Sequence, residues 1–236
     1  MDLKERYLRN MLALSAEDVE KLHTKKVCII GSGGLGGYIL ENLARIGILH
    51  ITIVDFDVFE ASNLNRQLLS TESVMGIPKT EVAVRRVNTV NSQVKITGLQ
   101  MKFDETNGED ILKGHDIVMD ALDSISTRLL LAEICRKLNI PLVHGSIGGW
   151  YGQVACVFPG DKTLEKIYNT ATEDRGIEKN LGNLPFTAAM IASLQCAECI
   201  KILTGKGDVL RNSVLHADLL HNEFYNMAIE KDAYQF

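Results

Sequence analysis

A glycine-rich turn and a more distant aspartate form the clearest chemical pattern in this sequence. The turn contains Gly31, Gly33, Gly34 and Gly36. Asp55 follows roughly 20 residues later, where a carboxylate can accept hydrogen bonds from ribose hydroxyls. Glycines let a backbone approach a phosphate closely. The pattern predicts a nucleotide site, for which a nicotinamide or flavin dinucleotide is the default ligand.

Further polar residues follow in the long connection over residues 58–82, which contains Ser62, Asn63 and Arg66. Ligands of parallel sheets bind at the carboxyl ends of the strands, so this connection is expected to line the site. Lys79 begins the next helical pattern, where its charge opposes the helix dipole. A surface lysine is the simplest interpretation, and the unfavourable placement also hints at a nearby anion.

A third group of polar residues ends another apolar run, at Asp120, Asp123 and Ser124. Either Asp123 or Ser124 could cap the helix that follows. Two carboxylates beside a phosphate site would also suit magnesium, which takes one or two carboxylates together with phosphate oxygens. The residues by themselves leave both interpretations open.

The elements around the glycine turn have the order that a nucleotide site requires. An apolar, β-rich run over 27–30 leads into the turn, and a helical pattern follows that ends near Gly47. A second apolar run over 51–54 ends at Asp55. A helix that begins at the turn directs free N–H groups and its positive dipole end at a phosphate. This order favours a βαβ unit over an unordered glycine-rich loop.

Composition describes a soluble globular protein: 236 residues, 46% hydrophobic and 23% charged. The net charge of −5 argues against nucleic acid or an anionic membrane as partner. No apolar run reaches the ~18 residues of a transmembrane helix. The charged N-terminus is unlike a secretory signal. Five cysteines, mostly in apolar runs, indicate a reducing cytosol, and Cys196 with Cys199 fits a helix core better than a zinc site.

We predict one domain over residues 1–236. Its α/β fold is a Rossmann-like nucleotide-binding sheet that is parallel in its N-terminal half, is extended by antiparallel strands and carries helices on both faces. The expected parts are a helical arm at 1–24, a nucleotide-binding core at 26–145, a crossover loop at 160–185, and a closing helix with strands at 186–236. The crossover loop has no periodicity, so we expect it to be mobile. Residues 5–10 contain little apolar material, which favours a solvated helix end.

Together the motifs resemble those of the E1-like activating superfamily, of the ThiF/MoeB/HesA type. Its bacterial members adenylylate ubiquitin-like sulfur carriers for molybdopterin and thiamine synthesis. The resemblance runs from Arg6 to about Ile229 and rests on the glycine turn and on three further motifs: NLNRQ at 63–67, GIPK at 76–79 and DALDS at 120–124. It implies ATP and Mg²⁺ in place of a dinucleotide, and a homodimer.

The resemblance also implies residue roles. The catalytic residues would be Arg9, Arg66, Lys79 and Asp123, with Asp123 holding magnesium and Arg9 reaching into the partner subunit's site. The nucleotide would be bound by Gly31, Gly33, Gly34, Gly36, Asp55, Ser62, Asn63, Arg66, Lys79, Asp123 and Ser124.

The implied reaction joins two anions, because the C-terminal glycine carboxylate of a carrier ending in Gly-Gly attacks the α-phosphate of ATP. The products are an acyl-adenylate and pyrophosphate. Cations must neutralise the charge that develops. The carboxylate is already ionised at neutral pH, so no general base is needed.

The chain departs from the family pattern in several places. It lacks the two CxxC pairs that bind structural zinc in many members, so we predict no zinc. Residues 160–185 contain no cysteine, so sulfur would come from a separate donor. Ser124 and Asn10 replace the usual Asn and Gln. Alternative functions are an E1-like enzyme acting on another carboxylate, such as a tRNA threonylcarbamoyladenosine dehydratase, or a non-catalytic nucleotide-binding scaffold. A dinucleotide oxidoreductase is the most distant alternative.

Overall fold

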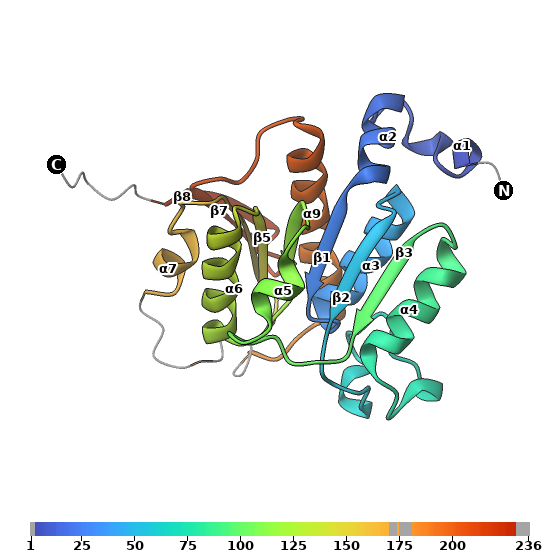
Figure 1. Cartoon of the computed structure of the whole chain (residues 1–236). Helices are drawn as coiled ribbons and strands as arrows, with labels where there is room; N and C mark the ends of the chain where they lie inside the picture. Colours follow the sequence, from blue (N-terminus) through green and yellow to red (C-terminus); the bar gives the residue numbers. More distant parts are fainter. Residues whose placement is uncertain (1–2, 170–173, 175–180, 230–236) are drawn as a thin grey trace.

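The computed structural model describes residues 3–169, 174 and 181–229, and in these residues eight strands form one sheet with helices on both faces (Figure 1). The strands are β1 Lys26–Ile30, β2 His50–Val54, β3 Lys95–Leu99, β4 Ile117–Asp120, β5 Leu142–Gly148, β6 Tyr151–Val157, β7 Ser213–Asp218 and β8 Glu223–Ala228. The α-helices are α1 Leu3–Arg6, α2 Ala16–Thr24, α3 Gly34–Ile46, α4 Lys79–Val90, α5 Gly108–Leu112, α6 Ile125–Leu138, α7 Thr163–Ile167 and α9 Pro185–Thr204. Three short 3-10 turns are η1 Leu8–Asn10, η2 Ala61–Asn63 and η3 Glu72–Val74.

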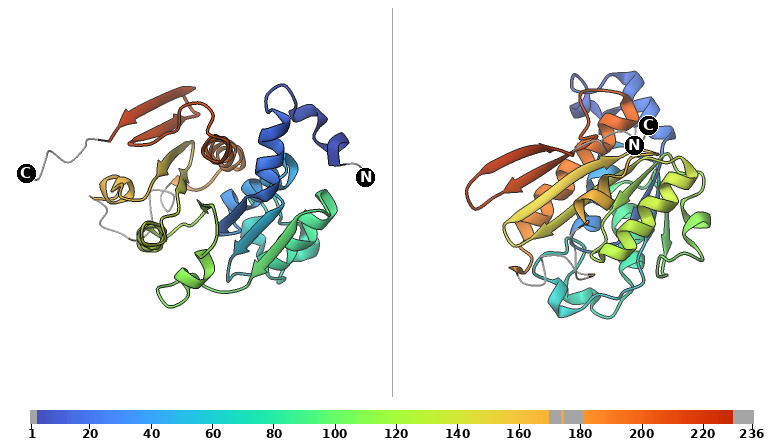
Figure 2. Two further views of the ribbon diagram at one scale, coloured as in Figure 1. Left: turned by 45° about the horizontal axis from the view of Figure 1, so that its top comes forward. Right: turned by 90° about the vertical axis from the view of Figure 1, so that its left-hand side faces the viewer.

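The strand order is β3-β2-β1-β4-β5-β6-β7-β8. The first five strands of this order run parallel, and β6, β7 and β8 each pair antiparallel with the strand before them. The β7–β8 hairpin extends the sheet at the end away from β3 (Figure 2). This arrangement confirms the predicted fold, a parallel N-terminal half extended by antiparallel strands.

Strand β1 lies in the middle of the parallel half and is buried on both faces. Val27 and Ile29 pack into one core with residues of α3, α4 and α9. Cys28 and Ile30 pack into a second core with residues of α5, α6 and α7. Burial on both faces explains why the run is apolar without alternation.

Helix α9 is long and apolar enough to cross a membrane by length and composition alone, but it is a core helix. Ile191, Ala192 and Cys199 are completely buried, and Cys196 is 8% exposed. Burial raises the pKa of Cys196 to about 12. The five cysteines are all buried and unpaired, which agrees with the prediction that Cys196 and Cys199 belong to the core.

The crossover at 160–185 differs from expectation at its start. Thr163–Ile167 form helix α7, in which Leu164 is completely buried against the second core. A helix of five residues is too short to show a period in the sequence, and its polar residues dominate the pattern. Much of the remainder, residues 170–173 and 175–180, lies outside the described residues.

The N-terminal arm is helical as predicted, but residues 5–10 are not simply solvated. Tyr7 is only 1% exposed, and its hydroxyl accepts a hydrogen bond from Asn91 Nδ2 at 2.9 Å. The Tyr7 ring lies 5.1 Å from the ring of His23. Tyr7 therefore helps to anchor the arm, while Arg9 stays exposed.

The arm is also tied to the end of α9 by Asp18, which accepts from Ser15 N at 2.7 Å and pairs with Lys206 at 2.8 Å. These contacts lower the pKa of Asp18 from 3.8 to about 2. A depressed folded-state pKa contributes stability above the unfolded value, and that contribution is lost as pH falls through the folded value.

We therefore expect Asp18→Asn to lower the free energy of unfolding near neutral pH. The deficit should shrink between about pH 4 and about pH 2, as Asp18 of the wild type becomes protonated. Urea unfolding across this range measures it, with Glu20→Gln, an exposed acid of the same helix, as control. A deficit that does not vary with pH would contradict the ionic contribution.

Candidate active site

The glycine turn packs between the ends of three parallel strands. Gly31 N donates to Val54 O at 2.8 Å, and Ala121 N donates to Ile30 O at 2.9 Å. A Cβ at Gly31, whose φ is +101°, would lie 2.5 Å from Ala121 O, and one at Gly36 would lie 1.9 Å from Gly31 O. These two glycines are therefore required by the turn itself, before any ligand is considered.

The other two predicted glycines begin the helix. Gly33 is the N-cap of α3, and Gly34 is its first residue. The first N–H groups of a helix have no partner within it, so the start of α3 offers donors and a positive dipole end. The sequence prediction of a strand, turn and helix around these glycines is confirmed.

A pocket of about 240 Å³ opens at this edge of the sheet, between the glycine turn, the connection after β2 and the turn after β4. It brings together three residues that the sequence predicted separately: Gly34, Arg66 and Asp123. The remaining lining residues are Leu35, Gln67, Ala121, Leu122, Arg128, Ile147 and Asn183. Donors from α3, a guanidinium and a carboxylate thus face one small space.

Asp55 lies beside the turn at the end of β2. One carboxylate oxygen accepts from Ser32 N at 2.6 Å, and the other accepts from Asp57 N at 2.8 Å. Burial raises the pKa of Asp55, while the charge of Lys79 opposes the increase. A carboxylate has about four acceptor positions, so roughly two remain for hydroxyl donors such as those of a ribose.

Lys79 begins α4 and is buried, not a surface lysine. Its Nζ lies 2.9 Å from Asp57 Oδ2, and its backbone N donates to Asp57 O at 3.0 Å. The anion that the sequence hinted at is thus supplied within the chain, by a residue that the sequence analysis did not select. The Asp57 side chain is 46% exposed, whereas that of Lys79 is 7% exposed, so the carboxylate of this ion pair faces solvent and the ammonium group is buried.

Arg66 and its neighbours are held by the connection after β2. Arg66 Nη1 donates to Ser62 O at 3.1 Å and to Asn65 Oδ1 at 2.8 Å. Its aliphatic part passes over Gly34. Asn63 is 8% exposed, and its Oδ1 accepts from Glu60 N at 3.1 Å. Asn63 therefore stabilises the connection, and the described residues engage only Nη1 of the Arg66 guanidinium.

The acids after β4 separate into different environments. Asp120 is completely buried, and its Oδ2 accepts from His144 Nδ1 at 2.6 Å, so it is not available to a metal ion. Ser124 is the N-cap of α6, where its hydroxyl accepts from Thr127 N at 3.3 Å. Asp123 is exposed and makes no hydrogen bond or ion pair with any residue that the structure describes. Mg²⁺ takes one or two carboxylates together with phosphate oxygens, so of these acids Asp123 is the one that could hold it.

Of the predicted catalytic residues, Arg66 and Asp123 line this pocket, whereas Lys79 and Arg9 do not, and Arg9 lies at the other end of α3. It lies in η1, and the neighbouring Asn10 donates to Ile46 O at the far end of α3. Helix α3 has 13 residues. At about 1.5 Å per residue, about 20 Å separates its two ends. Arg9 instead lines a largely apolar groove of about 610 Å³ between η1, α3 and α9.

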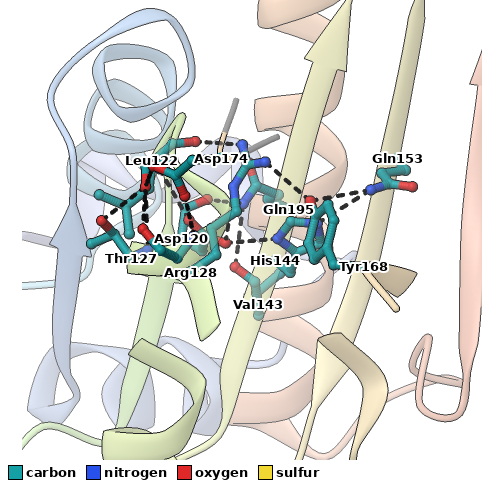
Figure 3. Close-up of polar contacts among 12 residues, drawn as sticks. Asp120, Leu122, Thr127, Arg128, Val143, His144, Gln153, Tyr168, Asp174 and Gln195 are labelled. Carbon is teal, nitrogen blue, oxygen red and sulfur yellow. Dashed lines mark hydrogen bonds and ion pairs between the residues drawn. The ribbon is translucent and has the colours of Figure 1, made fainter. Parts of the chain in front are cut away.

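A buried polar network of Arg128, Tyr168, His144 and Asp120 lies beside the pocket (Figure 3), and the sequence analysis did not predict it. Arg128, 4% exposed, lines the pocket and donates to Tyr168 OH at 3.0 Å. Tyr168 OH lies 3.1 Å from His144 Nε2, and burial lowers the pKa of His144. A neutral His144 therefore donates from Nδ1 to Asp120 and accepts from Tyr168. The sequence signal for this network is an arginine that directly precedes the apolar run Leu129–Leu131 of α6.

Comparisons with known proteins identify the family of this chain. The model of the ThiF family matches residues 7–235. The SAMP-activating enzyme E1 of Haloferax volcanii is 32% identical over 93% of this chain and 83% of its own length. The sulfur carrier protein adenylyltransferase of Thermus thermophilus is 31% identical over 97% of this chain and 88% of its own. The chain spans only 52% of the Culex quinquefasciatus adenylyltransferase and sulfurtransferase MOCS3, at 34% identity over 95% of this chain.

Solved structures show the same fold at lower identity. PaaA superimposes with a TM-score of 0.82 and 21% identity, over 97% of this chain and 74% of its own. Escherichia coli MccB with ATP superimposes with a TM-score of 0.79 and 21% identity, over 96% of this chain and 72% of its own.

Proposed function

The chain belongs to the ThiF family, and we propose that it is an adenylyltransferase that uses ATP to activate a small ubiquitin-like sulfur-carrier protein. The observation that carries this proposal is the pocket in which the start of α3, Arg66 and Asp123 meet. Relatives named as a SAMP-activating E1 and a sulfur carrier protein adenylyltransferase support it over most of their length.

In the proposed reaction the C-terminal glycine carboxylate of the carrier attacks the α-phosphate of ATP. The bond to pyrophosphate breaks, and an acyl-adenylate forms. Free N–H groups at the start of α3 and the guanidinium of Arg66 would bind the phosphates and neutralise charge in the transition state. Lys79, which already faces Asp57, would add a second cation, and Asp55 would bind the ribose.

We propose that Asp123 holds Mg²⁺, which when bound would neutralise phosphate charge. The accessible carboxylate of Asp123 fits this role, whereas the buried carboxylate of Asp120 does not. Ser124 is already engaged as a helix cap and would support this turn, not the ion.

We propose a homodimer in which Arg9 completes the partner subunit's site. Two observations support it: Arg9 lies about 20 Å from the pocket of its own chain along α3, and it borders an apolar groove that a second copy could cover.

Sulfur would arrive from a separate donor that acts on the adenylate. The five cysteines are all buried, and burial raises the pKa of Cys196 to about 12, so none is poised as a nucleophile. Their unpaired state also supports action in the cytoplasm. The carrier would serve thiamine or molybdopterin synthesis, or a related pathway.

Carrier-dependent exchange of radiolabelled pyrophosphate into ATP tests this function. We expect exchange with a carrier from the same genome that ends in Gly-Gly, and none after its last glycine is deleted. Transfer RNA in place of the carrier should give none. Absence of exchange with every such carrier, or absorbance of a bound dinucleotide in the purified protein, would overturn the proposal.

A further inference from the structure

The turn that presents Asp123 is held by both backbone groups of the preceding residue. Leu122 N donates to Asp120 Oδ1 at 3.0 Å. Leu122 O accepts from Arg128 Nη2. This carbonyl belongs to the peptide bond that joins Leu122 to Asp123, so Arg128 fixes the orientation of the peptide plane that leads into Asp123.

Arg128 is in turn held from outside the predicted site. Its Nη1 donates to Tyr168 OH at 3.0 Å, and its guanidinium lies 5.8 Å from the centre of the Tyr168 ring. Tyr168 is the C-cap residue of α7. The crossover segment therefore reaches the turn after β4 through two side chains.

A second branch closes the contacts into a ring (Figure 3). Tyr168 OH lies 3.1 Å from His144 Nε2, and His144 Nδ1 donates to Asp120 Oδ2 at 2.6 Å. Gln195 Nε2 donates to Asp120 O at 2.8 Å. Asp120 and His144 are completely buried, and Arg128 is 4% exposed, so a broken contact leaves a polar group without water.

We propose that Tyr168 is a positioning residue for adenylylation, whose hydroxyl holds Arg128 in the orientation that presents Asp123 to the nucleotide. This inference rests on the proposed function, because it takes Asp123 as part of the reacting site. Tyr168 itself does not line the pocket, and of the residues that its hydroxyl contacts Arg128 is the one that does, so we take Arg128 as the route.

Tyr168→Phe keeps the ring and removes only the hydroxyl. We expect kcat of carrier-dependent exchange to fall about 10-fold, because small misplacements of a reacting group are costly, while KM for the carrier stays nearly constant. The melting temperature should fall by a few degrees, because buried groups that contact the hydroxyl lose a partner. Tyr225→Phe, which removes a hydroxyl from exposed strand β8, should leave both constants unchanged.

A double-mutant cycle with Arg128→Lys tests the route. Lysine carries a single ammonium and cannot contact Leu122 O and Tyr168 OH as the fork of arginine does. If Tyr168 acts through Arg128, then Tyr168→Phe causes no further loss of kcat in a chain that already carries Arg128→Lys. The inference would be overturned if the two substitutions lowered kcat independently, so that their fold-losses multiplied in the double variant. A wild-type kcat in Tyr168→Phe alone would overturn it as well.

A measurement without substrates separates this inference from the proposed function. Amide hydrogen exchange of the peptide that contains residues 121–124 should become faster in Tyr168→Phe than in the wild type and unchanged in Tyr225→Phe. If hydrogen exchange of this peptide is unchanged in Tyr168→Phe, Tyr168 does not hold the turn before Asp123, and the inference is refuted. If the wild type shows no pyrophosphate exchange with any carrier, the proposed function fails, and the hydrogen exchange alone still decides whether Tyr168 holds the turn.

Discussion

Replacement of Arg9 by alanine is expected to lower carrier-dependent pyrophosphate exchange by roughly 10²- to 10³-fold, the loss typical of removing one group that stabilises transition-state charge. The fold should survive, because Arg9 is exposed and Tyr7 anchors the arm. Exchange kinetics and a thermal melt measure the two effects. Lys21→Ala, which removes an exposed cation from α2, is the matched control.

The same variant decides whether Arg9 acts on its own subunit or on the partner. Arg9→Ala and Asp123→Asn chains carrying different tags can be co-expressed, and dimers with both tags purified. If Arg9 acts across the interface, one site per dimer is intact, and about half of the wild-type activity returns. If Arg9 acts within its own chain, both sites are defective, and the dimer is as inactive as either parent.

Lys79→Met is expected to reduce kcat of exchange by roughly 10³-fold, because the site loses a buried cation that would stabilise transition-state charge. Methionine retains much of the volume of a side chain that is 7% exposed. Asp55 also loses the charge that opposes the increase of its pKa, so that pKa should rise further. Exchange kinetics and nuclear magnetic resonance titration of Asp55 measure these effects.

Arg85→Met provides the control for Lys79→Met, since it removes an exposed cation from the same helix. Its exchange rate should match that of the wild type. Near-normal activity of Lys79→Met would show that the Lys79–Asp57 ion pair is only structural, and would remove Lys79 from the proposed phosphate site.

Local patterns predicted the frame of the site correctly. The glycine turn, the helix end at Gly47 and the helix end at Gly205 rely on backbone conformations that glycine adopts readily, with φ of +108° and +75° at the two helix ends. The cap at Ser15 is formed by residues that are neighbours in sequence. Such features depend on short-range sterics and hydrogen bonds, so the sequence contains them in full.

The position of each charged side chain required the tertiary structure. Asp120 and Asp123 look alike in sequence, but strand pairing places Asp120 beside His144 of β5 and leaves Asp123 exposed at the pocket. The sequence is compatible with Lys79 as a surface lysine, whereas the structure buries it and places Asp57, from the connection after β2, against it.

The sequence by itself determined the nucleotide-binding unit, the order of the strands and of the longer helices, and the family resemblance with its candidate residues. Only the tertiary structure decided which acid reaches the pocket, that Arg9 lies far from the pocket of its own chain, and that Arg128 and Tyr168 hold the turn before Asp123. The physical reason is that burial and ionic partners depend on contacts between distant segments, and Tyr168 meets Arg128 across 40 positions of the chain.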